Sequence, residues 1–197
     1  CEDLRFEGVY VENALGQGSG SDNIAVESGR NIVIFDTEVT QAGADGIDLK
    51  ASEITIVAAR VHDVARNGIK LWHSADVISS VVAHSGADAA VVFDRPGRYR
   101  LLNTLVTDHN FGGLSSYVMT VGYGQSGEYD VALVNSAFHR TAGSVWVNPD
   151  TALRVSNCSF SSADNRVALD GPGPGGMIQI TYADDPAVFG THGFGDG

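Results

Sequence analysis

The chain has 197 residues and a hydrophobic content of 43%, which suits one globular domain with a buried core. Its formal charge is -12, from 24 acidic and 12 basic side chains, so nonspecific attachment to nucleic acid or to an anionic membrane is disfavoured. No stretch approaches the roughly 18 consecutive apolar residues of a membrane span. We therefore expect neither nucleic acid nor a membrane as a partner.

Three apolar residues recur with fixed spacing from residue 4 onward. The second follows the first by two positions, and the third follows the first by seven. The copies in chain order are Leu4/Phe6/Val11, Ile32/Ile34/Val39, Ile54/Ile56/Val61, Ala75/Val77/Val82, Tyr99/Leu101/Val106, Val131/Leu133/Phe138 and Leu153/Val155/Phe160. A spacing of two is typical of a strand, because alternate side chains point to one face of a sheet. Each copy therefore predicts a leading strand, a bend and a short strand.

A second apolar pair, again two residues apart, follows each triple after a connection of variable length. The pairs are Ile24/Val26, Ile47/Leu49, Ile69/Leu71, Val91/Phe93, Val118/Thr120, Val145/Val147 and Val167/Leu169, and Ile178/Ile180 fit the start of an eighth unit. We call these segments the Gly-Ile strands, because Gly46 and Gly68 precede two of them. The residue between the two apolar ones is expected to face solvent, at Asp48, Lys70, Val92, Met119, Trp146 and Ala168.

A residue suited to a sharp bend stands four positions after the start of each triple. These residues are Gly8, Asp36, Ala58, Ser79, Asn103, Asn135 and Asn157. Most are small or turn-forming, and Asn and Asp tolerate the left-handed backbone that such a bend requires. The bend is therefore predicted to be part of the repeat.

Equivalent residues of successive units are expected to stack in register at about 4.8 Å and to form one continuous core. The segment GIDLKASEITIVAARVHD, residues 46–63, resembles the repeat of right-handed parallel β-helix proteins of the pectate lyase-like superfamily. We therefore expect an all-β fold, a right-handed parallel β-helix (solenoid) of about seven coils. A leucine-rich repeat, suggested by Leu-x-Val-x-Asn at Leu153, fits worse, because the second strand pair stands where a helix should be.

The repeats assign residues 1–197 to a single parallel β-helix domain, with coils over 1–182 and a C-terminal tail over 183–197. No helix is predicted to cover the first coil, and the tail offers only partial cover at the other end. Open coils expose core and unpaired strand edges. We therefore expect a fragment of a longer protein or a module without caps, with self-association through the open coil ends. Long connections from Glu12, Thr107 and Val121 are candidate cleft walls.

Five of the twelve basic residues flank the Gly-Ile strands over three coils. They are Lys50, Lys70, Arg95, Arg98 and Arg100. Such a stripe could neutralise uronate carboxylates, and Trp72 beside it could stack on a sugar ring. The alternative is a solvated face, in which Asp48 and Lys70 form an exposed ion pair worth about 0 to 1 kcal/mol. The substrate-binding candidates are Lys50, Trp72, Arg95 and Arg98.

A second group of ionisable residues lies just after the short strands, one to three positions past the third apolar residue of a triple. It comprises His62, Asp63, His84, Asp108, His109, His139 and Arg140. Imidazoles with carboxylates can act as general acid and base, or can ligate a transition metal. Structural or solvated roles are the alternative for each of them.

The resemblance implies a polysaccharide groove along the face of the Gly-Ile strands, with uronate chemistry there. That chemistry needs a carboxylate neutraliser, a base and an acid. The catalytic candidates are Lys70, Asp48, His62, His84 and Asp63, with Arg95 or Arg98 as the neutraliser. Calcium is the one cofactor that we consider. No metal ligand is assigned, because Asp45, Asn67, Asp164 and Asn165 are interpreted as turn residues rather than calcium ligands.

Two classes of function stay open. The first is a noncatalytic or vestigial β-helix module for interaction with a carbohydrate or a surface. The second is a lyase or epimerase that acts on a uronate-containing polysaccharide. An acidic polysaccharide is the expected partner in both cases, and the fold resemblance implies an extracellular or cell-surface location.

Overall fold

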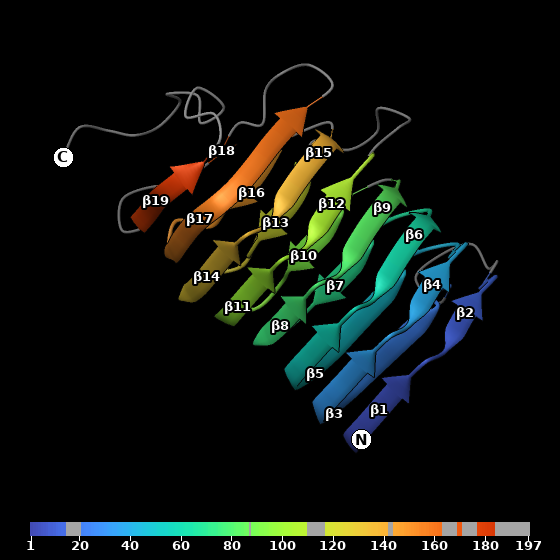
Figure 1. Ribbon diagram of the computed structural model, residues 1–197. Coiled ribbons are helices and arrows are strands. Elements are labelled where there is room, and N and C mark those ends of the chain that lie inside the picture. Colours follow the sequence, from blue (N-terminus) through green and yellow to red (C-terminus); the bar gives the residue numbers. More distant parts are fainter. Residues whose placement is uncertain are drawn as a thin grey trace.

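The computed structural model describes residues 1–14, 21–86, 88–109, 117–141, 144–162, 169–170 and 177–183. Every helix or strand within these residues is a β-strand. The strands coil around one axis, and each pairs in parallel with strands of the neighbouring coils (Figure 1). No helix long and apolar enough to cross a membrane occurs in this part of the chain.

The leading strands form the first of three ladders. The leading ladder contains β1 (Glu2–Glu7), the second half of β3 (Ile24–Phe35), the second half of β5 (Ile47–Val57), β8 (Ala75–Ile78), β11 (Gly97–Leu102), β14 (Tyr129–Val134), the first half of β17 (Thr151–Ser162) and β19 (Met177–Ala183). Ile32 pairs with Leu4 on one side and with Ile54 on the other. The predicted register of the triples is therefore confirmed here.

The other two ladders complete each coil. The short ladder contains β2 (Tyr10–Glu12), β4 (Glu38–Thr40), β6 (Arg60–Val64), β9 (Val81–Ser85), β12 (Leu105–Thr107), β15 (Ala137–Thr141) and the second half of β17. The Gly-Ile ladder contains the first halves of β3 and β5, then β7 (Ile69–Leu71), β10 (Val91–Phe93), β13 (Tyr117–Val121), β16 (Ser144–Val147) and β18 (Leu169–Asp170). A coil thus consists of one strand from each ladder.

The core is a set of columns of stacked apolar side chains that run along the axis. Ile47 pairs with Ile69, and Ile69 pairs with Val91. All three are fully buried. Burial of one such side chain stabilises the fold by about 1.5 to 3 kcal/mol, so the columns are the main source of stability. The predicted all-β parallel β-helix is confirmed.

The predicted bend between leading and short strands adopts a left-handed backbone in every coil. The seven predicted residues have φ between 47° and 61°. Asn157 also donates a hydrogen bond from Nδ2 to Oδ1 of Asn135 at 2.7 Å, which links the bends of two coils. A second left-handed position occurs at or just after the end of the short strands, at Asn13, Gln41, Asp63, His84 and Asp108, with φ between 47° and 66°. The sequence analysis does not predict this second bend.

The predicted register is wrong by one residue in β13. Met119 pairs with Val91 and Thr120 pairs with Val92, so Met119 points into the core and Thr120 points outward. The physical reason is that the segment has apolar residues at both alternating positions, and Val118 is also buried. A register shift between Tyr117 and Met119 in the pairing with β16 accommodates it.

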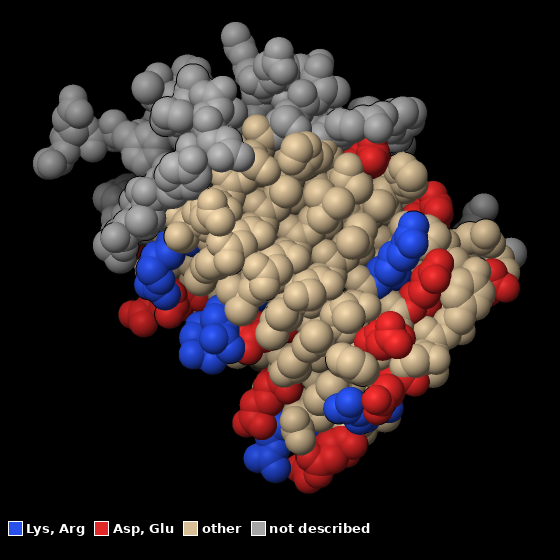
Figure 2. All heavy atoms as spheres, in the orientation of Figure 1, with Lys and Arg blue, Asp and Glu red and all other residues tan. Residues whose placement is uncertain are grey.

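The face formed by the leading and short ladders carries little charge at its centre (Figure 2). The outward side chain of Ile78 stands beside Leu102, which stands beside Val134. Charged side chains on this face gather toward its rim (Figure 2). Arg100 and Asp76 of neighbouring leading strands form an ion pair. The basic cluster described below lies on the Gly-Ile ladder instead.

Glycine precedes the Gly-Ile strands at Ile47 and Ile69 because the coil leaves no room for a side chain at Gly46 and Gly68. A Cβ at Gly68 would lie 2.3 Å from Cγ1 of Val82 and 2.9 Å from the carbonyl oxygen of Ala90. We expect Gly68→Ala to lower the free energy of unfolding by about 1 to 3 kcal/mol, as measured by urea denaturation. The cost should be smaller when Val82 is also changed to alanine, because the clash is relieved. Equal costs in the two backgrounds would contradict this explanation.

Ala58 is the bend residue least suited to its backbone. It is exposed and has a φ of 54°, which costs a residue with a Cβ about 1 to 2 kcal/mol. We expect Ala58→Gly to raise the free energy of unfolding by about 1 kcal/mol. Ala25 provides the matched control, because it is exposed in the regular strand β3. Ala25→Gly should destabilise by about 0.5 to 1 kcal/mol, and a similar loss at Ala58 would refute the bend assignment.

Candidate functional site

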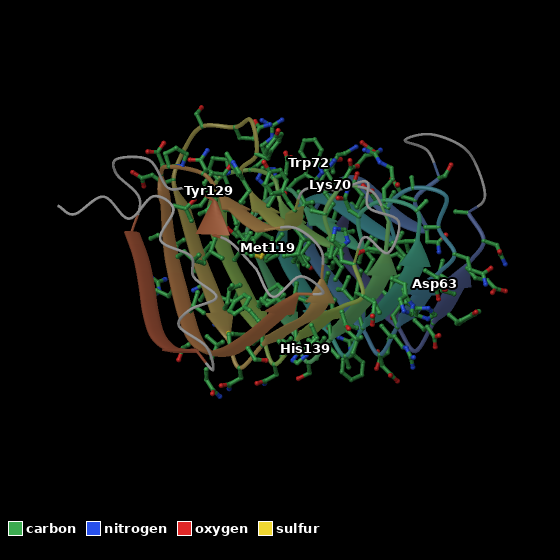
Figure 3. All side chains as sticks on the ribbon, turned by 90° about the horizontal axis from the view of Figure 1, so that it is seen from above. Asp63, Lys70, Trp72, Met119, Tyr129 and His139 are labelled. Atoms are coloured by element: carbon green, nitrogen blue, oxygen red, sulfur yellow. The ribbon has the colours of Figure 1, made fainter. Side chains whose placement is uncertain are left out.

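Trp72 follows β7 and lies close to Lys70 next to the Gly-Ile ladder (Figure 3). Lys50 Nζ, Lys70 Nζ and Arg95 Cζ lie 5.3, 5.0 and 5.1 Å from the centroid of its ring. The negative π-system of an indole attracts cations at this distance, by about 0.5 to 1 kcal/mol each at exposed sites. We call Asp48, Lys50, Lys70, Trp72 and Arg95 the Trp72 cluster.

Asp48 supplies the negative charge of the Trp72 cluster. Its Oδ1 accepts a hydrogen bond from Trp72 Nε1 at 2.8 Å, and its Oδ2 lies 3.8 Å from Lys50 Nζ. Asp48 is 7% exposed. Burial raises the pKa of Asp48, and the charge of Lys70 and the hydrogen bond from Trp72 oppose that rise. These contacts favour a role for Asp48 in fixing the indole.

Lys70 differs from the other two cations of the cluster in its partners. Lys50 Nζ lies 2.7 Å from Glu27 Oε2, and Arg95 donates to Gln125 Oε1 at 2.7 Å. Arg95 Nε also lies 3.3 Å from Asp94 Oδ2. Among the residues that the structure describes, Lys70 has no hydrogen bond or ion pair; its contact is with the Trp72 ring. Its charge acts on Asp48 and Asp45 without a direct ion pair, so its ammonium group can still donate hydrogen bonds to a ligand.

A pocket of about 340 Å³ opens beside Lys70 on the Gly-Ile ladder. Its lining includes the acidic Asp94, the aromatic Tyr117 and Tyr123, and Arg66, whose Nε donates to Asp88 at 2.8 Å. The volume is within the range of about 300 to 1,000 Å³ found for small-ligand sites. The pocket could therefore hold part of a small ligand or of a polymer.

The predicted histidine group lies elsewhere, on the short ladder and the bend after it. His62 Nε2 lies 2.9 Å from Glu38 Oε1, and His62 Nδ1 lies 2.6 Å from Asp63 Oδ2. His84 continues this row: its Nδ1 is 3.2 Å from Asp63 Oδ1, and its Nε2 is 3.9 Å from Asp108 Oδ2. Figure 3 shows Asp63 well away from Lys70 and Trp72. We call these five residues the bend row.

The bend row has a structural reason to contain these residue types. Asp63, His84 and Asp108 are all left-handed, with φ of 54°, 47° and 53°. Asp, Asn and His are the side chains, after glycine, that are enriched in this conformation. The predicted catalytic set therefore divides between two places: Lys70 and Asp48 in the Trp72 cluster, and the other three in the bend row.

Arg98, His109 and His139 form hydrogen bonds with partners other than the members of the Trp72 cluster. Arg98 is the second residue of the leading strand β11, where its backbone amide donates to Ser74 Oγ at 3.0 Å. His109 is buried, with Nδ1 2.7 Å from Ser85 Oγ, and burial lowers its pKa to about 4. His139 Nε2 lies 3.2 Å from Ser159 Oγ. The side chain of Arg140 lies outside the described residues.

Asp45 and Asn67, which the sequence analysis interprets as turn residues, bond to each other. Asp45 Oδ1 accepts hydrogen bonds from the backbone amide and from Nδ2 of Asn67, at 3.1 and 2.9 Å. These two residues thus satisfy each other between neighbouring coils. No group of three or more His, Cys, Asp or Glu that could hold a metal occurs within the described ranges. Asp164 and Asn165 lie outside them.

Sequence reasoning misses the aromatic part of the pocket. Tyr123 is 58% exposed and lies in the connection that follows Val121, which the sequence analysis marks as a candidate cleft wall. The signal in the sequence is a tyrosine between two glycines, Gly122 and Gly124, in this connection. The connections from Glu12 and Thr107 include residues outside the described part of the chain.

The pKa of His62 provides a test of a structural role for the bend row. Burial lowers this pKa, but the hydrogen bonds with Asp63 and Glu38 outweigh burial and raise it above the ordinary value. The stabilising contribution should therefore be complete below about pH 6.5 and be lost as the pH rises through the raised pKa. We expect the destabilisation by His62→Gln, measured by urea denaturation, to shrink with rising pH. A constant or growing difference would contradict this assignment.

Comparison with known proteins places the chain in a family. The family model for a right-handed β-helix region matches residues 4–185. The crystal structure of the pectate lyase Pel9A is similar, with a TM-score of 0.46 and 13% sequence identity. The match covers 89% of this chain and 58% of the pectate lyase, so the chain spans little more than half the length of that protein. No curated protein matches. Because the family model covers most of its length, the chain belongs to the right-handed β-helix family.

Proposed function

We propose that this chain is a noncatalytic module that binds a uronate-containing polysaccharide on the outer face of the Gly-Ile ladder. The observation that carries the proposal is Lys70, a cation without a described ion pair that lines a pocket beside two further cations. A protein with a net charge of -12 repels polyanions unless it has a local basic site. Such a module would act outside the cell or at its surface.

In this proposal the members of the Trp72 cluster have different roles in binding. A sugar carboxylate at Lys70 would form a charge-assisted hydrogen bond, worth about 1.5 to 3 kcal/mol. Lys50 and Arg95 would add longer-range attraction, because each already has an acidic neighbour. Trp72 already has three cations near its ring, so in this proposal it positions them and does not stack on a sugar.

A uronate lyase or epimerase is the second candidate, and one observation favours it. Lys70 and Asp94 line the same pocket, which brings a basic and an acidic group together. His62, Asp63 and His84 lie in the bend row and would take no part. Incubation with alginate or pectate distinguishes the two functions, because a lyase produces unsaturated uronate that absorbs in the ultraviolet. An epimerase would exchange the sugar C5 proton with solvent.

Removal of the Lys70 charge should weaken binding to an acidic oligosaccharide. We expect Lys70→Ala to raise the dissociation constant for oligogalacturonate at least about tenfold, because one charge-assisted hydrogen bond is lost. Isothermal titration calorimetry at constant ionic strength measures the change.

Arg98→Ala is the matched control for this experiment. It removes one exposed positive charge from the leading ladder, and we expect binding to change less than twofold. Equal losses in the two variants would mean that net charge alone attracts the ligand, and the proposed site would be wrong. Ultraviolet absorbance that rises with the wild type and not with Lys70→Ala would establish the lyase instead.

A further inference from the structure

An aromatic platform stands beside the Lys70 pocket, on its C-terminal side along the axis. The ring centroid of Tyr123 lies 5.6 Å from that of Tyr117 and 5.1 Å from that of Trp146. Tyr123 and Tyr117 also line the Lys70 pocket. The three rings therefore form one surface that continues the pocket toward the next coils.

The outward side chains of the Gly-Ile ladder change from charged to uncharged along this surface. Lys70 pairs with Val92, Val92 pairs with Thr120, and Thr120 pairs with Trp146. The column is cationic at Lys70 and uncharged over the next three coils. At about 4.8 Å per coil, Trp146 lies roughly 14 Å from Lys70 along the axis. A ligand that extends from Lys70 along the column would pass from a charged environment to an aromatic one.

The segment that carries Tyr123 is held in place from several sides. Asn148 Nδ2 donates to the carbonyl oxygens of Gly122 and Gln125, at 3.3 and 2.7 Å. Arg95, a member of the Trp72 cluster, donates to the Gln125 side chain. Gly122 has a φ of 65°, and a Cβ there would lie 2.5 Å from the Tyr129 ring. The exposure of Tyr123 is thus a product of specific contacts.

We propose that Tyr117, Tyr123 and Trp146 bind an uncharged sugar ring next to a uronate held at Lys70. The faces of aromatic rings offer apolar surface to the C–H groups of a sugar, and their negative π-systems do not attract a carboxylate. The ligand class is then a copolymer in which uronates are interspersed with neutral sugars. This inference rests on the proposed function, because it takes the Lys70 contact as its starting point.

Three hexasaccharides of equal length test the inference by isothermal titration calorimetry. One contains galacturonate alone, one alternates glucuronate with N-acetylglucosamine, and one contains N-acetylglucosamine alone. We expect the alternating probe to bind most tightly. Tyr123→Ala and Trp146→Ala should each weaken the alternating probe about 3- to 10-fold and change the galacturonate probe less than twofold.

Two controls separate the platform from general damage. Tyr123→Phe keeps the ring and should bind like the wild type, while Tyr10→Ala removes another tyrosine that is 57% exposed and should have no effect. Unchanged binding of the alternating probe by Tyr123→Ala, or equal weakening of both acidic probes, would overturn the inference. Loss of affinity in Lys70→Ala alone would leave the proposed function standing without the platform. Loss of affinity in Tyr123→Ala alone would show that the aromatic rings bind the ligand, and it would refute the proposed uronate contact at Lys70.

Discussion

The fold depends on one constraint: each coil must lie in parallel register on the coil before it. Backbone hydrogen bonds between coils set the axial spacing, and the inward columns of Ile, Val, Leu and Phe add the hydrophobic stabilisation. A slip of one residue in a strand would turn its apolar side chains outward. The left-handed bends and the glycines before the Gly-Ile strands serve this constraint, because they let the chain change direction without losing register.

The same constraint generates the candidate site. Residues far apart in the sequence become neighbours because outward positions also form columns, as Asp48 and Lys70 do on the Gly-Ile ladder. Connections between the ladders are free of the repeat, so their length and composition can change without disturbing the core. The Trp72 cluster and the aromatic platform are both built in this way, from outward ladder positions combined with side chains of connecting segments.

The features that repeat in every coil can be predicted from the sequence, and the features that do not repeat cannot. The columns through Ile69 and the first bend follow from spacing alone, because both recur in every coil. The slip at Met119 does not, because β13 has apolar side chains at both alternating positions. The proximity of Asp48 and Lys70 is predictable from register. The pocket wall at Tyr123 is not, because a connection without a period leaves its path undetermined.

Electron spin resonance distances would test the stacking most directly. Arg5 and Arg154 occupy one outward column of the leading ladder, six coil spacings apart, and Thr55 stands four spacings from Arg154. Cysteines for spin labels would be placed at these pairs after Cys1 and Cys158 are changed to serine. The account predicts distances of about 29 Å for the first pair and about 19 Å for the second. Distances that do not decrease by about 10 Å between the two pairs would contradict it.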